Sequence, residues 1–138
     1  MPHFLVKEEP THYAYADLAR EGATEWSGVH NPTALIHLRA IRRGDQGLYY
    51  HSGSVRAAVG IVRALGAPYL EPKDPRKSWS VRLGAVRELR RPVPFAEMRD
   101  APGFEKFDVF RIGRLSVAPV PDPLWKRVLA LERVDPDA

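Results

Sequence analysis

Three stretches in the middle of the chain have the length and composition of β-strands: residues 46–52, 57–66 and 78–89. Only residues 53–56 separate the first two, which predicts a hairpin. In the third, Trp79, Val81 and Leu83 alternate with other residues, so one face of that strand would be apolar. These stretches favour a fold built on a curved, mostly antiparallel sheet.

Short helices are predicted on either side of these strands. The clearest spans residues 31–45, where Asn31 can cap the first turn, Pro32 suits the first helical position and Gly44 ends the segment. Its apolar stripe consists of Ala34, Leu35, Leu38 and Ile41. A strand is expected over residues 3–7 and an extended segment over residues 111–120. Helices are expected over Tyr15–Glu21 and near residues 93–100. A last helix is expected from Asp122, with Leu124, Val128 and Leu131 on one side.

The pattern as a whole predicts one α+β domain over residues 1–138, with short helices around the sheet. Hydrophobic residues make up 44% of the chain, enough for a core. We expect the sheet to pack around Val6, Leu48, Val59, Ile61 and Val81. Residues 24–31, "TEWSGVHN", fit neither helix nor strand and are expected to form a turn.

Several classes of protein are disfavoured. There are no cysteines, so disulfide frameworks, thiolate zinc sites and Cys nucleophiles are excluded. The first ten residues lack the apolar run of a signal peptide, and the longest apolar run, residues 57–62, is far below the ~20 residues of a membrane span. We therefore expect a cytoplasmic protein without membrane contact, a monomer by default.

The charge permits a nucleic-acid partner. Basic residues number 21 against 17 acidic ones, a net charge of +4, and 16 of the 21 are arginine. Arginine suits phosphate forks and base stacking, and we expect Arg42 and Arg43 to line a face near any binding pocket. Arginine enrichment from genome composition alone explains the same counts equally well.

Catalytic motifs are weak. His51 and Ser52 are adjacent, and neighbouring strand residues point to opposite faces, so they cannot act as base and nucleophile. The five histidines lack zinc-site spacing, and no phosphate-binding glycine loop occurs. Catalysis would depend on Lys7, Glu8, Glu9 and His51. No metal or cofactor is expected.

Six motifs occur together in a recognisable order: "FLVKEEP", "WSGVHNPTA", "GDQGLYYHS", "VGIV", "SWSV" and "RIGRLSVAPV". In order and spacing they resemble the EVE domain family of the PUA-like superfamily, which is related to the YTH readers of methylated adenine. The resemblance implies a small curved β-barrel with short flanking helices. It also implies a pocket that receives one nucleobase, often a modified one.

The resemblance also implies a set of site residues. The matching positions are Lys7, Glu9, Trp26, Gly28, Val29, Asn31, Tyr50, His51, Ser52, Trp79, Arg111 and Arg114. Glu8 and His30 replace a serine and an arginine of the family pattern. His30 belongs to the expected pocket, as does Ser27, which with Gly28 would let a ligand approach the backbone. Asn31 could act as helix cap or as pocket donor.

These residues support a non-catalytic module that binds a modified base in DNA or RNA. We expect Trp26 and Trp79 to form two walls of one pocket, with Lys7, Glu9 and Ser52 at its floor. Either tryptophan could instead cap the core. Two alternatives stay open: a hydrolase or nuclease like the ASCH relatives, using Lys7, Glu9 and His51, and a sensor of free nucleosides or other small molecules.

Overall fold

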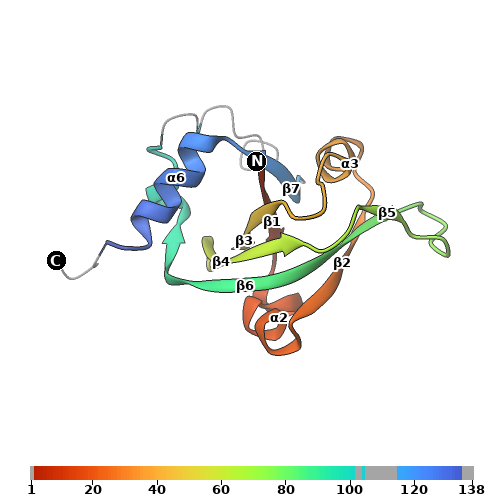
Figure 1. Cartoon of the computed structure of the whole chain (residues 1–138), viewed down its shortest axis with the longest axis horizontal. Coiled ribbons are helices and arrows are strands. Elements are labelled where there is room, and N and C mark those ends of the chain that lie inside the picture. Colours follow the sequence, from red (N-terminus) through yellow and green to blue (C-terminus); the bar gives the residue numbers. More distant parts are fainter. Residues whose placement is uncertain (1, 102–103, 105–114, 135–138) are drawn as a thin grey trace.

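The computed structural model describes residues 2–101, 104 and 115–134 (Figure 1). Its strands are β1 (His3–Glu8), β2 (Ala23–Val29), β3 (Gln46–His51), β4 (Ala57–Ala64), β5 (Tyr69–Leu70), β6 (Trp79–Pro94) and β7 (Val117–Val120). Its helices are α1 (Pro10–Tyr13), α2 (Tyr15–Glu21), α3 (Pro32–Arg39), α4 (Phe95–Met98) and α6 (Asp122–Leu131). Arg111 and Arg114 lie outside the described residues.

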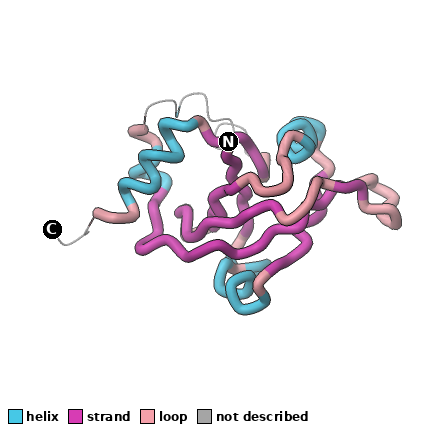
Figure 2. The backbone as a smooth tube through the Cα atoms, viewed as in Figure 1, coloured by secondary structure: helices cyan, strands magenta, loops and turns pink. Residues whose placement is uncertain are grey.

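One mixed sheet of seven strands curls into a half-barrel, with the helices around it (Figures 1 and 2). The strand order is β2-β6-β4-β3-β1-β7, and β5 pairs with β6 outside this path. Only the β1–β3 pair is parallel among the described strands; the other pairs are antiparallel. The predicted α+β class and the β3–β4 hairpin are confirmed. The third predicted strand is longer than expected, because β6 continues to Pro94.

The prediction of a turn over residues 24–31 is wrong. Ala23–Val29 form β2, in which Trp26 pairs with Val81 of β6. The pairing shifts register between Trp26 and Val29, and Gly28 has φ +85° within this bulge. The polar, glycine-containing sequence gave no local strand signal, because the pairing of this strand depends on β6, which is distant in the sequence. Gly28 supplies the left-handed backbone conformation that the bulge needs.

The helix predictions hold where the signals are local. The Asn31 Oδ1 accepts hydrogen bonds from the backbone N–H groups of Thr33 and Ala34, so the cap is confirmed. The helix ends at Arg39, earlier than Gly44. In α6 the expected stripe is buried as predicted, and its members are Leu124, Val128 and Leu131.

The core fills the inside of the curled sheet. Four of the five expected core residues are fully or nearly fully buried, and Val59 is half-buried against them. Helix α2 closes one side through Tyr15, whose hydroxyl donates to the Ile61 carbonyl at 2.8 Å. Helix α6 is fixed by Glu132, whose buried carboxylate accepts hydrogen bonds from both Nη atoms of Arg87 at 2.8 and 2.6 Å.

Among the described residues, no helix is long and apolar enough to cross a membrane.

The contact between α2 and β4 gives a stability prediction. A Cβ at Gly60 would lie 2.4 Å from the Tyr15 ring, which is buried and hydrogen-bonded and so cannot swing aside. Overpacking of this kind costs ~1–3 kcal/mol. We expect Gly60→Ala to lower the free energy of unfolding by that amount in urea denaturation. Gly66→Ala is the matched control, since nothing lies within 4 Å of its added Cβ; an equal loss in both variants would contradict the prediction.

Candidate nucleic-acid interface

The end of β1 is the centre of the candidate site. Lys7 pairs with Tyr50 of the parallel strand β3, and the Ser52 N–H donates to the Glu8 carbonyl at 3.0 Å. A hollow of about 200 Å³, here called the Lys7 hollow, opens beside them. It is lined by Lys7, Tyr50, Ser52, Gly53, Arg56 and Phe95. Burial lowers the pKa of the half-buried Lys7 amine.

Arg56 and Phe95 complete this hollow. The Arg56 guanidinium lies 4.8 Å from the centre of the Phe95 ring, a cation–π arrangement. The Phe95 N–H donates to the Arg56 carbonyl at 2.9 Å, which holds the two residues together although they are 39 positions apart. Arg56 is the last residue of the connection between β3 and β4. Its side chain is exposed, and its backbone has a left-handed conformation with φ +51°. The lining of the hollow therefore includes two cations and the hydroxyl groups of Tyr50 and Ser52.

A larger hollow of about 420 Å³ adjoins the end of β2 and is here called the Gly28 hollow. Its lining consists of Gly28, Val29, His30, Asn31, Pro32 and Ser116. Gly28, with its φ of +85°, leaves backbone accessible there, and the Gly28 carbonyl lies 3.0 Å from the His30 Nδ1. Because the Asn31 Oδ1 is committed to the helix cap, only its amide NH₂ remains to meet a ligand.

The two hollows are neighbours. The Lys7 N–H donates to the Ser116 carbonyl at 2.8 Å, and Lys7 lines one hollow while Ser116 lines the other. This hydrogen bond continues the β1–β7 ladder. The structure thus brings predicted site residues from three segments, together with Ser116, to these two adjacent hollows.

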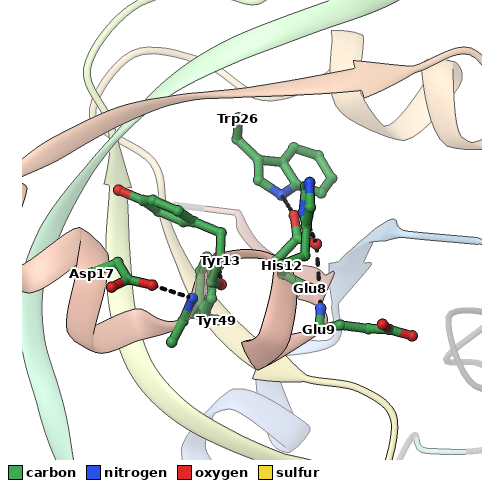
Figure 3. Close-up of polar contacts among 8 residues, drawn as sticks. Glu8, Glu9, His12, Tyr13, Asp17, Trp26 and Tyr49 are labelled. Atoms are coloured by element: carbon green, nitrogen blue, oxygen red, sulfur yellow. Dashed lines mark hydrogen bonds and ion pairs between the residues drawn. The ribbon is translucent and has the colours of Figure 1, made fainter.

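Trp26 and Glu8 belong to a third, smaller hollow of about 160 Å³, lined also by His12, Tyr13, Thr24, Glu25 and Ser27. The Trp26 indole N–H donates to Glu8 Oε2 at 3.2 Å, and the Glu9 N–H donates to Glu8 Oε1 at 3.2 Å (Figure 3). The His12 Nδ1 also lies 2.8 Å from Glu8 Oε1. Glu8, which stands where the family pattern has serine, is therefore held by three neighbours.

The expected two-walled pocket is not what the structure shows. Trp26 is only 5% exposed, and its indole lies in the core cluster. Trp79 is half-buried, with the Arg39 guanidinium 4.9 Å from the centre of its ring. Neither tryptophan lines the Lys7 hollow. Glu9 is exposed and points away from Trp26 (Figure 3). It does not line the Lys7 hollow, which Lys7 and Ser52 share.

His51 lies on the opposite side of the sheet from Ser52, as strand alternation predicted. It lines a separate hollow next to Tyr15, whose backbone N–H donates to the His51 Nε2 at 3.1 Å. Burial lowers the pKa of His51, although the charge of Glu8 acts in the other direction. Lys7, Glu9 and His51 are therefore not brought together as a catalytic group. In the described part of the chain, no three His, Asp or Glu side chains gather as metal ligands.

One further expectation concerned Arg42 and Arg43, and some residues that line the two hollows were not predicted at all. Arg42 and Arg43 precede β3, whereas Tyr50 and Ser52 lie at its other end, and neither arginine lines the Lys7 hollow or the Gly28 hollow. The hollow residues that were not predicted as site residues are Pro32, Gly53, Arg56, Phe95 and Ser116. Arg56 ends the predicted hairpin turn and could have been noticed there, but Phe95 depends on the β4–β6 pairing.

The fold and the motifs agree with the comparisons to known proteins. The model of the EVE domain family matches residues 2–131. The chain belongs to the EVE domain family. Thymocyte nuclear protein 1 of Gallus gallus is 30% identical over 97% of this chain and 70% of its own length. The human protein of that name is 27% identical over 97% of this chain and 75% of its own length.

Solved structures show the same fold. A protein from Agrobacterium tumefaciens aligns with a TM-score of 0.88 and 29% identity, covering 97% of this chain and 94% of its own. Human thymocyte nuclear protein 1, solved in complex with DNA that contains 5-methylcytosine, aligns with a TM-score of 0.86 and 24% identity over 99% of this chain and 100% of its own. An ASCH protein from Zymomonas mobilis is more distant, with a TM-score of 0.58 and 10% identity over 94% of each chain, a likeness of fold alone.

The burial of Trp26 predicts a loss of stability on truncation. Removing a buried tryptophan side chain costs ~3–5 kcal/mol, and Trp26→Ala also strips Glu8 of one donor. We expect a fall in the thermal midpoint of about 10 °C or more, measured by circular dichroism. Trp79→Ala serves as the comparison, because Trp79 is half-buried and should cost less. An unchanged midpoint in Trp26→Ala would mean that this side chain is not part of the core.

His51 predicts a pH dependence of folding. Its pKa is lower in the folded state than its ordinary value of 6.5, so the unfolded chain binds this proton more readily. Stability should therefore fall as the pH drops below about 6.5, and the loss is complete below the folded-state pKa. Urea unfolding at a series of pH values should show a shallower dependence for His51→Gln. His3, whose pKa is lowered mainly by burial, contributes in the same direction and remains in that variant; equal slopes in both proteins would contradict the assignment to His51.

Proposed function

We propose that this chain is a non-catalytic module that binds DNA carrying a modified base, with the base in the Gly28 hollow and an adjacent phosphate in the Lys7 hollow. The observation that carries the proposal is the pairing of these two hollows across the Lys7–Ser116 hydrogen bond. One has space and accessible backbone, and the other has cations. A nucleotide presents the same two features side by side.

Size and chemistry assign the two parts of the ligand. The Gly28 hollow, at about 420 Å³, falls in the range of ~300–1,000 Å³ typical of small-molecule pockets. The Lys7 hollow is smaller, at about 200 Å³. Lys7, Arg56 and the Ser52 hydroxyl supply the donors that bind a phosphate. An extruded base held beside its own phosphate is a known way for proteins to read a base.

The choice of 5-methylcytosine as the first ligand to test comes from the human relative, which was solved with DNA containing that base. Trp26 has a supporting role in this proposal. Its buried indole N–H donates to Glu8 of β1, and this bond helps to fix β2, the strand that carries Ser27 and Gly28. The hydrolase alternative loses support, because its three residues face different surroundings. Binding of a free nucleoside remains an outcome of the test.

The test is fluorescence anisotropy with labelled oligonucleotides that differ only in one 5-methylcytosine. A buried methyl group contributes ~0.8 kcal/mol, so we expect roughly fourfold tighter binding of the methylated strand. Equal affinity for both strands would overturn the proposal. Equal affinity for 5-methyl-2′-deoxycytidine and the oligonucleotide would make the chain a nucleoside binder, and cleavage of the strand on a gel would make it an enzyme.

The phosphate role of Arg56 gives a second measurement on the same DNA. Hydrogen bonds to charged groups contribute ~1.5–3 kcal/mol, so Arg56→Gln should weaken binding roughly tenfold or more. The preference for the methylated strand should persist, because phosphate contacts do not read bases. The matched control is Arg20→Gln, an exposed arginine on α2. An equal loss in both variants would show that only total charge matters.

A further inference from the structure

A projecting hairpin, here called the basic arm, consists of residues 69–80. Its base is the pairing of Tyr69 with Ser80 and of Leu70 with Trp79. Its tip carries three exposed cations, Lys73, Arg76 and Lys77. Figure 1 shows that the hairpin extends away from the sheet beyond α3 and β2. The site described above does not account for these cations.

The two acidic side chains of the arm face inward. The Asp74 carboxylate accepts hydrogen bonds from the buried Ser78 hydroxyl and the Arg76 N–H. The Glu71 carboxylate accepts the hydroxyl of Ser80, which is also buried. The Arg76 side chain is 66% exposed, and its Nε makes only a distant ion pair with Asp74 at 3.8 Å. The arm thus keeps its carboxylates against β6 and presents its cations to solvent.

The arm is also stiff for a surface loop. Pro72 and Pro75 fix two backbone angles, and the Lys77 N–H donates to the Asp74 carbonyl at 3.0 Å. Lys77 has φ +55°, a left-handed conformation that residues other than glycine rarely adopt. A cation therefore occupies a position where glycine would be conformationally easier. Cations on a stiff loop lose less conformational entropy on binding than cations on a flexible one.

The arm begins at the edge of the Gly28 hollow. Val29, which lines that hollow, pairs with Trp79, and Trp79 pairs with Leu70 at the base of the arm. A nucleotide in the hollow would therefore have its neighbours along the strand beside the arm. Each limb of the loop, about four residues, reaches at most ~13 Å, and phosphates of one strand follow at ~3.4 Å of helix rise.

We propose that the basic arm is a phosphate-binding surface for the DNA that flanks the recognised base, with Lys73, Arg76 and Lys77 each meeting the backbone. This proposal rests on the proposed function for the identity of the polymer. It adds a second contact region, separate from the Lys7 hollow. Because phosphate contacts carry no sequence information, the arm supplies affinity and position while the hollow supplies discrimination.

The test compares salt dependence in two triple variants of the full chain. In the arm variant, Lys73, Arg76 and Lys77 are changed to Gln. In the control, Lys126, Arg127 and Arg133 on and after α6 are changed to Gln; they are exposed and lie at the other end of the sheet (Figure 1). Both variants lose three positive charges. Anisotropy with a duplex containing one 5-methylcytosine is measured from 50 to 200 mM salt.

Removing three phosphate contacts should make the slope of log affinity against log salt concentration shallower by ~2.7 in the arm variant. Over that fourfold range of salt, wild-type affinity should fall ~40-fold more than that of the arm variant. The control should keep the wild-type slope. Equal slopes in the arm variant and wild type, or the same change of slope in both variants, would contradict the proposal that the basic arm binds phosphates. Thermal midpoints confirm that each variant is folded.

The two proposals fail in different measurements. If wild type shows no preference for the methylated duplex but the arm variant has the shallower slope, the hollow assignment is wrong and the arm stands. If the preference is present and the slopes are equal, the hollow stands and the arm is wrong.

Discussion

Strand β1 is hydrogen-bonded on both sides, and the rest of the candidate site depends on this. Its parallel partner β3 sets Lys7 beside Tyr50, and its antiparallel partner β7 brings Ser116 to the Lys7 backbone. A strand paired on both sides cannot shift register without breaking both ladders. The two hollows are therefore held at a fixed separation by backbone hydrogen bonds rather than by side chains. Under the proposed function, that rigidity would suit the fixed spacing between a base and its phosphate.

Local signals in the sequence predicted the elements whose causes are local. The Asn31 cap, the Pro32 start and the apolar stripe of α6 each depend on residues within a few positions, and each was confirmed. Strand β2 was missed because its pairing with β6 joins residues that are 50 to 61 positions apart. The same limit applies to the Lys7 hollow. Arg56 and Phe95 meet only because β4 pairs with the far end of β6, which no short window of sequence reveals.

Trp26 shows how the resemblance can bring a motif to the candidate site while implying a wall role that the burial of its side chain does not support. The motif around it does lie at the candidate site, since Gly28 and Asn31 line the larger hollow. The aromatic face itself is covered, however, because β2 packs the indole into the core. A tryptophan with its N–H bonded to a carboxylate, and with a buried face, stabilises the loop that follows it. Under the proposed function, recognition at this site would depend on backbone and polar groups more than on stacking.

Glu8 adds an electrostatic consequence for how a nucleic acid could lie on this surface. The third hollow, here called the Trp26 hollow, is lined by the Glu8 and Glu25 carboxylates, and Glu21 accepts the hydroxyl of Tyr13 beside it. Arg82 offsets part of this charge through its ion pair with Glu25 at 3.2 Å, while Lys7 and Arg56 line a different hollow. Like charges repel within a Debye length of ~8 Å at physiological salt, so a phosphate backbone is disfavoured over the Trp26 hollow. Under the two proposals, the favourable path for a strand would lead from the Lys7 hollow past Gly28 to the basic arm. A modest net charge of +4 can therefore direct a polyanion along one line, because the position of the acidic groups constrains it as much as the position of the basic ones.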